Sequence, residues 1–79
     1  MNINEKIEQI MEDINLSGFA NKINLNTREA AKVLGISLSS LEGMRRRSLG
    51  PTYLQIGKRV CYNKRSLAEY IMQSQIQTL

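Results

Sequence analysis

Two helix-capping signals on either side of a glycine constrain the fold of this chain most. Asn26 is followed three residues later by Glu29, the spacing of a capping box, so we expect a helix to begin there. Gly35 is the residue type that best takes the left-handed conformation past a helix end. Ser37 offers a second N-cap, and the helical pattern continues to the Gly50–Pro51 pair, which stops it. The sequence therefore predicts two short helices separated by a tight turn.

The same segment has the residue types that a helix-turn-helix requires. Ala31 supplies a small residue where the helices cross, and Gly35 supplies the turn glycine. Apolar residues stand at the positions that would seal the two helices together: Ala30, Leu34, Ile36, Leu41 and Met44. Because all of these fall in register, we interpret residues 26–50 as a helix-turn-helix.

The outward face of the second helix is small and basic. At about 100° of rotation per residue, the positions opposite the packing face are Ser39, Gly43 and Arg46. Small side chains let a helix backbone approach a DNA groove, and the arginine fork pairs with a guanine edge or a phosphate. Arg45 lies nearer the packing edge and Arg47 on a flank. The alternative is that these arginines only offset the dipole at the helix C-terminus.

A hairpin follows, with alternating segments at 53–56 and 60–63. A three-residue loop, 57–59, would pair Ile56 with Val60 and Leu54 with Tyr62, which places four apolar side chains on one face. That loop would lift Lys58 and Arg59 to the tip, where they would contact a phosphate backbone or a minor groove, unless the tip is an ordinary charged turn. A helix from residue 64 to about 74 is expected to pack the hairpin onto the first two helices.

Charge and composition narrow the function further. Residues 1–22 carry a net charge of −2 and residues 23–79 a net charge of +6, which suits either a polyanion or a solvated surface. Histidine is absent and Cys61 is the single cysteine, so the usual nucleophile, metal and disulfide arrangements are missing. We therefore expect no enzyme activity, no metal and no cofactor. No apolar run approaches the about 18 residues of a membrane span, so we expect a cytoplasmic protein without membrane contact.

The N-terminal part, residues 1–22, is expected to form a separate amphipathic helix before the domain of residues 23–79. Isoleucines stand at alternating spacings of four and three: Ile3, Ile7, Ile10 and Ile14. This narrow seam is too short for an independent coiled coil. It either packs onto its own domain or forms a homodimer or partner contact, and the sequence leaves both open.

The chain resembles the excisionase and MerR-like winged helix-turn-helix group, including AlpA-like phage regulators. The resemblance covers about residues 25–72 and rests on these segments: Leu25-Asn26-Thr27-Arg28-Glu29-Ala30-Ala31, Leu34-Gly35-Ile36-Ser37, Leu41, the arginine run, Gly50-Pro51, Ile56-Gly57-Lys58-Arg59-Val60 and Tyr62 to Tyr70. It implies a mainly α fold with a small β-hairpin, a winged helix-turn-helix preceded here by an extra N-terminal helix. Met44 departs from the aromatic residue usual in such proteins, and Glu42 and Gly43 replace larger or basic residues.

The resemblance also implies a function, namely sequence-specific binding of double-stranded DNA. The expected role is a phage or mobile-element excisionase or a small transcription regulator of the bacterial cytoplasm and nucleoid, with integrase or RNA polymerase as candidate partners and a homodimer or cooperative array on DNA. The expected DNA-binding residues are Thr27, Arg28, Ser39, Ser40, Gly43, Arg45, Arg46, Arg47, Tyr53, Lys58 and Arg59. The alternative is an adaptor that holds a protein partner through the N-terminal helix or an exposed Leu38.

Overall fold

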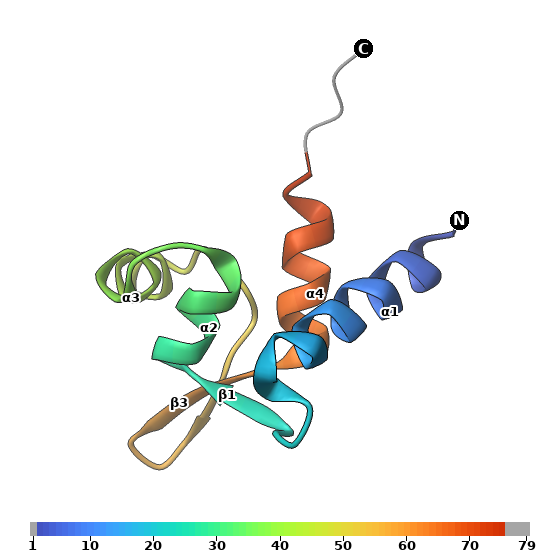
Figure 1. The fold of residues 1–79 in the computed structure, drawn as a ribbon. Helices are drawn as coiled ribbons and strands as arrows, with labels where there is room; N and C mark the ends of the chain where they lie inside the picture. Colours follow the sequence, from blue (N-terminus) through green and yellow to red (C-terminus); the bar gives the residue numbers. More distant parts are fainter. Residues whose placement is uncertain (1, 76–79) are drawn as a thin grey trace.

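A computed structural model describes residues 2–75 of the chain (Figure 1). Its elements in chain order are α1 (Ile3–Ile14), a π-helical turn (Asn15–Phe19), β1 (Asn24–Asn26), α2 (Thr27–Leu34), α3 (Leu38–Arg46), β2 (Leu54–Ile56), β3 (Arg59–Asn63) and α4 (Lys64–Gln73). Among these residues the fold is mainly helical with one small antiparallel sheet, as a winged helix-turn-helix requires.

The predicted caps hold α2 and α3 in place. Asn26 accepts from the Glu29 backbone N–H at 2.8 Å, and the Glu29 carboxylate accepts from the Asn26 backbone N–H at 3.0 Å, which completes the capping box. Gly35 ends α2 with a φ of 72°. The Ile36 N–H then donates to the Ala31 carbonyl at 3.0 Å, a Schellman closure that turns the chain toward α3. Ser37 caps α3, so the predicted turn is confirmed.

The C-terminal end of α3 differs from the prediction. We expected helix as far as the Gly50–Pro51 pair, but α3 ends at Arg46. Ser48 takes a left-handed conformation with a φ of 59°, and the Leu49 N–H donates to the Met44 carbonyl at 2.8 Å. This is a second Schellman closure, formed by serine in the position that glycine usually fills. The helix stops early for this reason, which the sequence pattern does not reveal.

The sheet has the order β1-β3-β2, and β1 was not predicted. β1 pairs antiparallel with β3 so that Leu25 lies opposite Tyr62. Both side chains are fully buried, which ties the start of the helix-turn-helix to the hairpin. A strand of three residues is too short to show a clear alternation in the sequence.

The hairpin of β2 and β3, called the wing below, has a different register from the one we expected. Ile56 lies opposite Arg59 and Leu54 opposite Cys61, so the loop has two residues and not three. Gly57 has a φ of 61° at the first position of this turn, the position where a type II′ turn needs glycine. The predicted pairing and the four-residue apolar face are therefore wrong. Tyr62 still points to the core, whereas Leu54 and Ile56 point away from it.

The N-terminal helix α1 packs against α4. Its residues Ile7 and Ile14 are 4% exposed, whereas Ile3 is 62% exposed. The Lys64 ammonium donates to the Asn15 side chain at 2.8 Å and joins the end of α1 to the start of α4. Ile7 and Ile14 of the isoleucine seam thus pack onto the chain's own domain, whereas a homodimer or partner contact of α1 stays a prediction.

Candidate nucleic-acid interface

The outward face of α3 presents the residues that the sequence placed there. Ser39, Ser40 and Arg46 are exposed, and Gly43 is half-buried. Ser37, the capping residue, donates its hydroxyl proton to the Ser40 hydroxyl at 2.7 Å, so the two serines brace the start of the helix. Arg46 makes no hydrogen bond or ion pair with residues 2–75, and its whole side chain stays available for a ligand.

Two of the three arginines of the run make contacts within the protein. The Arg47 Nε donates to the Gly43 carbonyl at 3.2 Å and so caps the C-terminal end of α3, which is the structural role considered from the sequence. The Arg45 guanidinium lies over the Tyr53 ring, 5.8 Å from its centroid. Cation–π contact of this kind joins α3 to the segment that leads into the wing.

Arg45 and Tyr53 belong to a small cluster at the base of the wing. The Tyr53 and Tyr62 ring centroids are 6.1 Å apart, and the rings are tilted by 51°. Burial raises the pKa of the Tyr62 phenol, and the positive charge of Arg45 partly offsets that rise. Arg45 is half-buried and its Nε has no hydrogen-bond partner among the described residues. The sequence pattern pointed to neither this cluster nor the contact between Arg45 and Tyr53.

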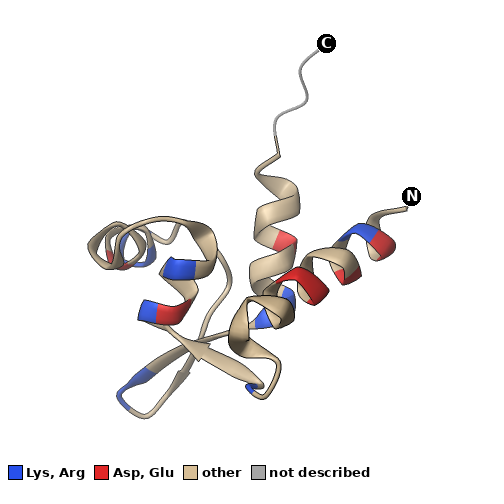
Figure 2. Cartoon of the chain, in the orientation of Figure 1, with Lys and Arg blue, Asp and Glu red and all other residues tan. Residues whose placement is uncertain are grey.

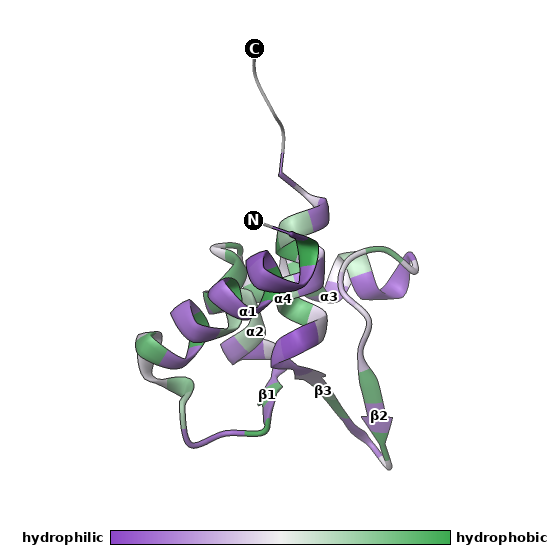
Figure 3. Cartoon of the chain, turned by 90° about the vertical axis from the view of Figure 1, so that its right-hand side faces the viewer, coloured by the Kyte–Doolittle hydropathy of each residue, from purple (hydrophilic) through white to green (hydrophobic). Residues whose placement is uncertain are grey.

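The wing presents its basic residues at the tip. Lys58 lies in the two-residue turn and Arg59 opens β3, and both are exposed. Figure 3 shows hydrophobic residues on β2, next to this tip. Leu54 and Ile56 are 43% and 63% exposed. The sequence prediction missed these two as surface residues because it assumed the longer loop.

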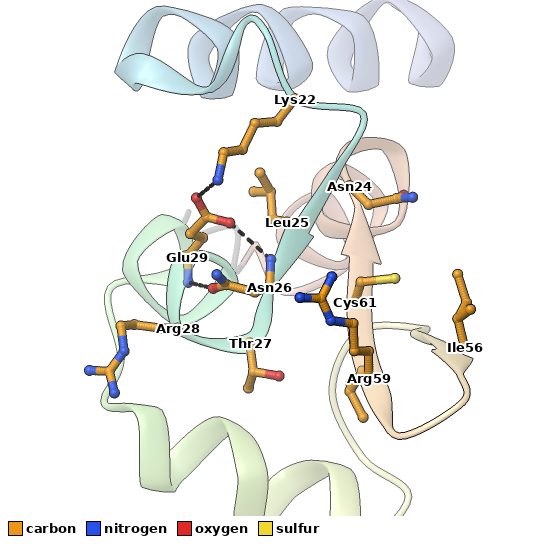
Figure 4. A pocket seen from close by; sticks show the side chains of 11 residues that line it. Lys22, Asn24, Leu25, Asn26, Thr27, Arg28, Glu29, Ile56, Arg59 and Cys61 are labelled. Carbon is orange, nitrogen blue, oxygen red and sulfur yellow. Dashed lines mark hydrogen bonds and ion pairs between the residues drawn. The ribbon is translucent and has the colours of Figure 1, made fainter.

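An open groove runs between the start of α2 and the wing (Figure 4). Thr27 and Arg28 line it on the α2 side, and Arg59 lines it on the side of β3. At its rim the Lys22 ammonium pairs with the Glu29 carboxylate, and this contact lowers the pKa of Glu29. Lys22 and Glu29 therefore neutralise each other, whereas Arg28 and Arg59 have no ion-pair partner within residues 2–75.

The charges are unevenly distributed over the molecule. Residues 43–68 hold seven Arg and Lys residues and no Asp or Glu. Figure 2 shows basic residues on α2, on α3, at the wing tip and at the start of α4, whereas the acidic residues lie mainly on α1, with others on α2, α3 and α4. Basic residues thus gather on several elements outside α1, which is the electrostatic pattern of a protein that binds a polyanion.

Other site types find no support in the part of the chain that the structure describes. Residues 2–75 contain no group of three or more Cys, Asp or Glu side chains placed to hold a metal ion. Across the same residues no helix is long and apolar enough to cross a membrane.

Comparison with known protein families identifies the domain. Residues 25–75 match the model of a helix-turn-helix domain family, a span that runs from β1 through α4 and leaves α1 outside. The chain belongs to this family. Its members are the excisionase and AlpA-like DNA-binding proteins, so the resemblance stated from the sequence is confirmed. This helix-turn-helix protein accordingly has DNA as its partner. The comparisons find no match among curated proteins or solved structures.

Proposed function

We propose that this helix-turn-helix protein binds double-stranded DNA sequence-specifically, with α3 in the major groove and the wing beside it. The observation that supports the proposal is that three elements carry exposed basic residues: Arg28 of α2, Arg46 of α3, and Lys58 and Arg59 of the wing. None of them forms an ion pair within the described residues. An unpaired cation near DNA displaces counterions, and this release drives binding to phosphates.

The elements divide the work of recognition. Arg46, the last residue of α3 and exposed, is proposed to reach a base edge, because an arginine fork pairs with the guanine edge in the major groove. Lys58 and Arg59 are proposed to contact the backbone and the adjacent minor groove. Thr27 and Arg28, at the start of α2, are proposed to contact the DNA backbone that separates the major groove from the minor groove. Ser39, Ser40, Gly43, Arg47 and Tyr53 border this surface.

Within this activity we propose the role of an excisionase or of a small transcription regulator, encoded by a phage or a mobile element and acting on the bacterial nucleoid. Membership of the family that contains excisionase and AlpA-like proteins supports this proposal. Integrase or RNA polymerase is the proposed protein partner for the respective role.

The second candidate function, an adaptor that works through α1, has weaker support. Ile7 and Ile14 are buried against the chain's own domain, and Ile10 is half-buried. Leu38, which we expected to be exposed, is half-buried too. The surface that α1 leaves free is mainly acidic (Figure 2). Ile7 and Ile14 are therefore not available for self-association in this arrangement of the chain.

Alanine variants titrated on two duplexes test the proposed function. One duplex is recovered by selection from a random pool, and the other has the same composition in scrambled order. Arg46→Ala should weaken binding to the selected duplex more than to the scrambled one. Lys58→Ala and Arg59→Ala should weaken binding to both, and each should reduce the slope of log affinity against log salt by about 0.9 for every phosphate that the variant no longer neutralises.

Lys6→Ala is the matched control, because Lys6 lies on α1 on the other side of the molecule (Figure 2). It removes the same charge and should leave affinity and salt slope nearly unchanged. Equal losses for all four variants, independent of sequence, would contradict the proposed division of work.

A further inference from the structure

The wing carries an apolar surface that the core does not use. β2 is an edge strand, and its residues Leu54 and Ile56 are 43% and 63% exposed. The register places Ile56 opposite Arg59 and Leu54 opposite Cys61, so these four side chains share the outer face of the hairpin. We call Leu54 and Ile56 the apolar strip. Figure 3 shows the two as hydrophobic residues on either side of a hydrophilic one in β2.

Folding does not account for the apolar strip. The inner face of the wing already supplies the core contacts, through buried Tyr62 and through Val60, which packs against the core. The turn and the register of this hairpin do not require isoleucine or leucine on its outer face, where polar residues are usual. The exposed apolar area therefore fits a surface that becomes covered when the protein binds a ligand.

The charges around the strip indicate what covers it. Lys58 and Arg59 stand at the end of the strip, and no Asp or Glu occurs in residues 43–68, which include the whole wing. The matching ligand must offer apolar surface bordered by negative charge. The minor groove of DNA has this character, because its walls are deoxyribose rings and its edges are two rows of phosphates.

We propose that the apolar strip, Ile56 foremost, packs against the deoxyribose walls of the minor groove while Lys58 and Arg59 contact the phosphates at its edge. This proposal rests on the proposed function, since it requires the wing to lie on DNA. Part of the affinity for DNA then comes from an apolar contact, in addition to the contacts that Lys58 and Arg59 make with phosphates. Ile56 carries most of that contact because it is the more exposed of the two and lies next to the tip.

Ile56→Thr tests the proposal in the full chain. Threonine keeps the β-branched shape that suits a strand and replaces an ethyl group by a hydroxyl. The removal of about two buried carbons should weaken binding to the selected duplex by about tenfold. The salt slope should stay unchanged, because an apolar contact releases no counterions. Hydroxyl-radical footprinting, which reports exposure of sugars in the minor groove, should show weaker protection over the nucleotides beside the major-groove site.

The control is Ile23→Thr, the same substitution at a residue that is 86% exposed but lies before β1, at the end of that strand away from the wing tip (Figure 1). It should alter neither affinity nor footprint. Unchanged affinity and sugar protection in Ile56→Thr would overturn the proposal while leaving DNA binding intact. Weaker self-association in sedimentation, with unchanged footprints, would overturn it in favour of a second copy on the strip. A wild-type chain that binds no duplex would overturn the proposed function itself.

Discussion

The glycine of the turn between α2 and α3 should be replaceable only at a measurable cost in stability. Gly35 has a φ of 72°, and a Cβ built there meets nothing within 4 Å. Gly35→Ala therefore adds no clash, and its effect isolates the backbone conformation. The left-handed region costs an L-residue roughly 1–2 kcal/mol. Alanine recovers about 0.4–1 kcal/mol by restricting the unfolded chain.

The free energy of unfolding should consequently fall by about 1 kcal/mol, which lowers the melting temperature by about 5 °C in a domain of this size. Urea denaturation followed by far-UV circular dichroism measures the first quantity, and a thermal scan measures the second. Gly43→Ala is the matched control. Gly43 lies inside α3 with ordinary helical geometry and open space around its Cβ, so the same substitution should stabilise the protein by about 0.5–1 kcal/mol. A Gly35→Ala variant as stable as the wild type would refute the left-handed turn.

The ends of two helices and the packing of α1 give three further predictions. Ser48 occupies a left-handed position with a φ of 59°. Ser48→Gly should therefore raise the free energy of unfolding, measured by urea denaturation, by about 0.5–1 kcal/mol. A variant less stable than the wild type would contradict this conformation at the end of α3. Lys22 and the Asn26 N–H lower the pKa of Glu29 from its ordinary 4.5, so the stability that this carboxylate contributes is fully present above 4.5 and is lost as the pH falls through the lower folded-state pKa. Glu29→Gln should thus be less stable than the wild type in thermal scans at about pH 7, and the difference should shrink as the pH falls below 4.5. A difference that is constant with pH would contradict the assignment. Ile7→Ala should lower the free energy of unfolding by about 3 kcal/mol, because Ile7 is only 4% exposed. Ile3→Ala, at a position that is 62% exposed, should lower it by less than about 0.5 kcal/mol. Equal effects of the two variants in urea denaturation would mean that α1 does not pack as described.

The sequence allowed correct prediction of the elements whose ends have chemical signals. The capping box of Asn26 and Glu29, the left-handed Gly35 and the N-cap Ser37 each act within one turn of chain, so the residue types alone indicate the structure. The helix after the hairpin was predicted from a different signal, the helical spacing of Leu67, Tyr70 and Ile71, and Leu67 is fully buried in α4.

The predictions that failed concern elements set by contacts between distant segments. β1 exists because Leu25 pairs with Tyr62 across more than thirty residues of chain, and three residues show no clear period. The wing register depends on whether the loop has two or three residues, and a change of one residue moves every side chain to the opposite face. The exposed position of Ile56 and the contact between Arg45 and Tyr53 both follow from this tertiary arrangement.

The candidate site was predicted in outline, since Arg46, Lys58 and Arg59 are exposed on the elements where the sequence placed them. The internal roles of neighbouring residues were not. Arg47 caps the C-terminal end of α3, an alternative that the sequence left open, and Arg45 lies over a tyrosine ring. The positions of the helix end and of the wing therefore decide which arginines of the run make contacts within the protein and which stay free, and the sequence does not give these positions.

Selection of bound sequences from a random duplex pool at about physiological ionic strength tests the central claim most directly. We predict an enriched motif, with affinity at least about a thousandfold higher than for the scrambled duplex in a subsequent titration. Failure to enrich any sequence, with only weak and salt-sensitive binding that is equal on both duplexes, would contradict sequence-specific recognition by α3 and the wing.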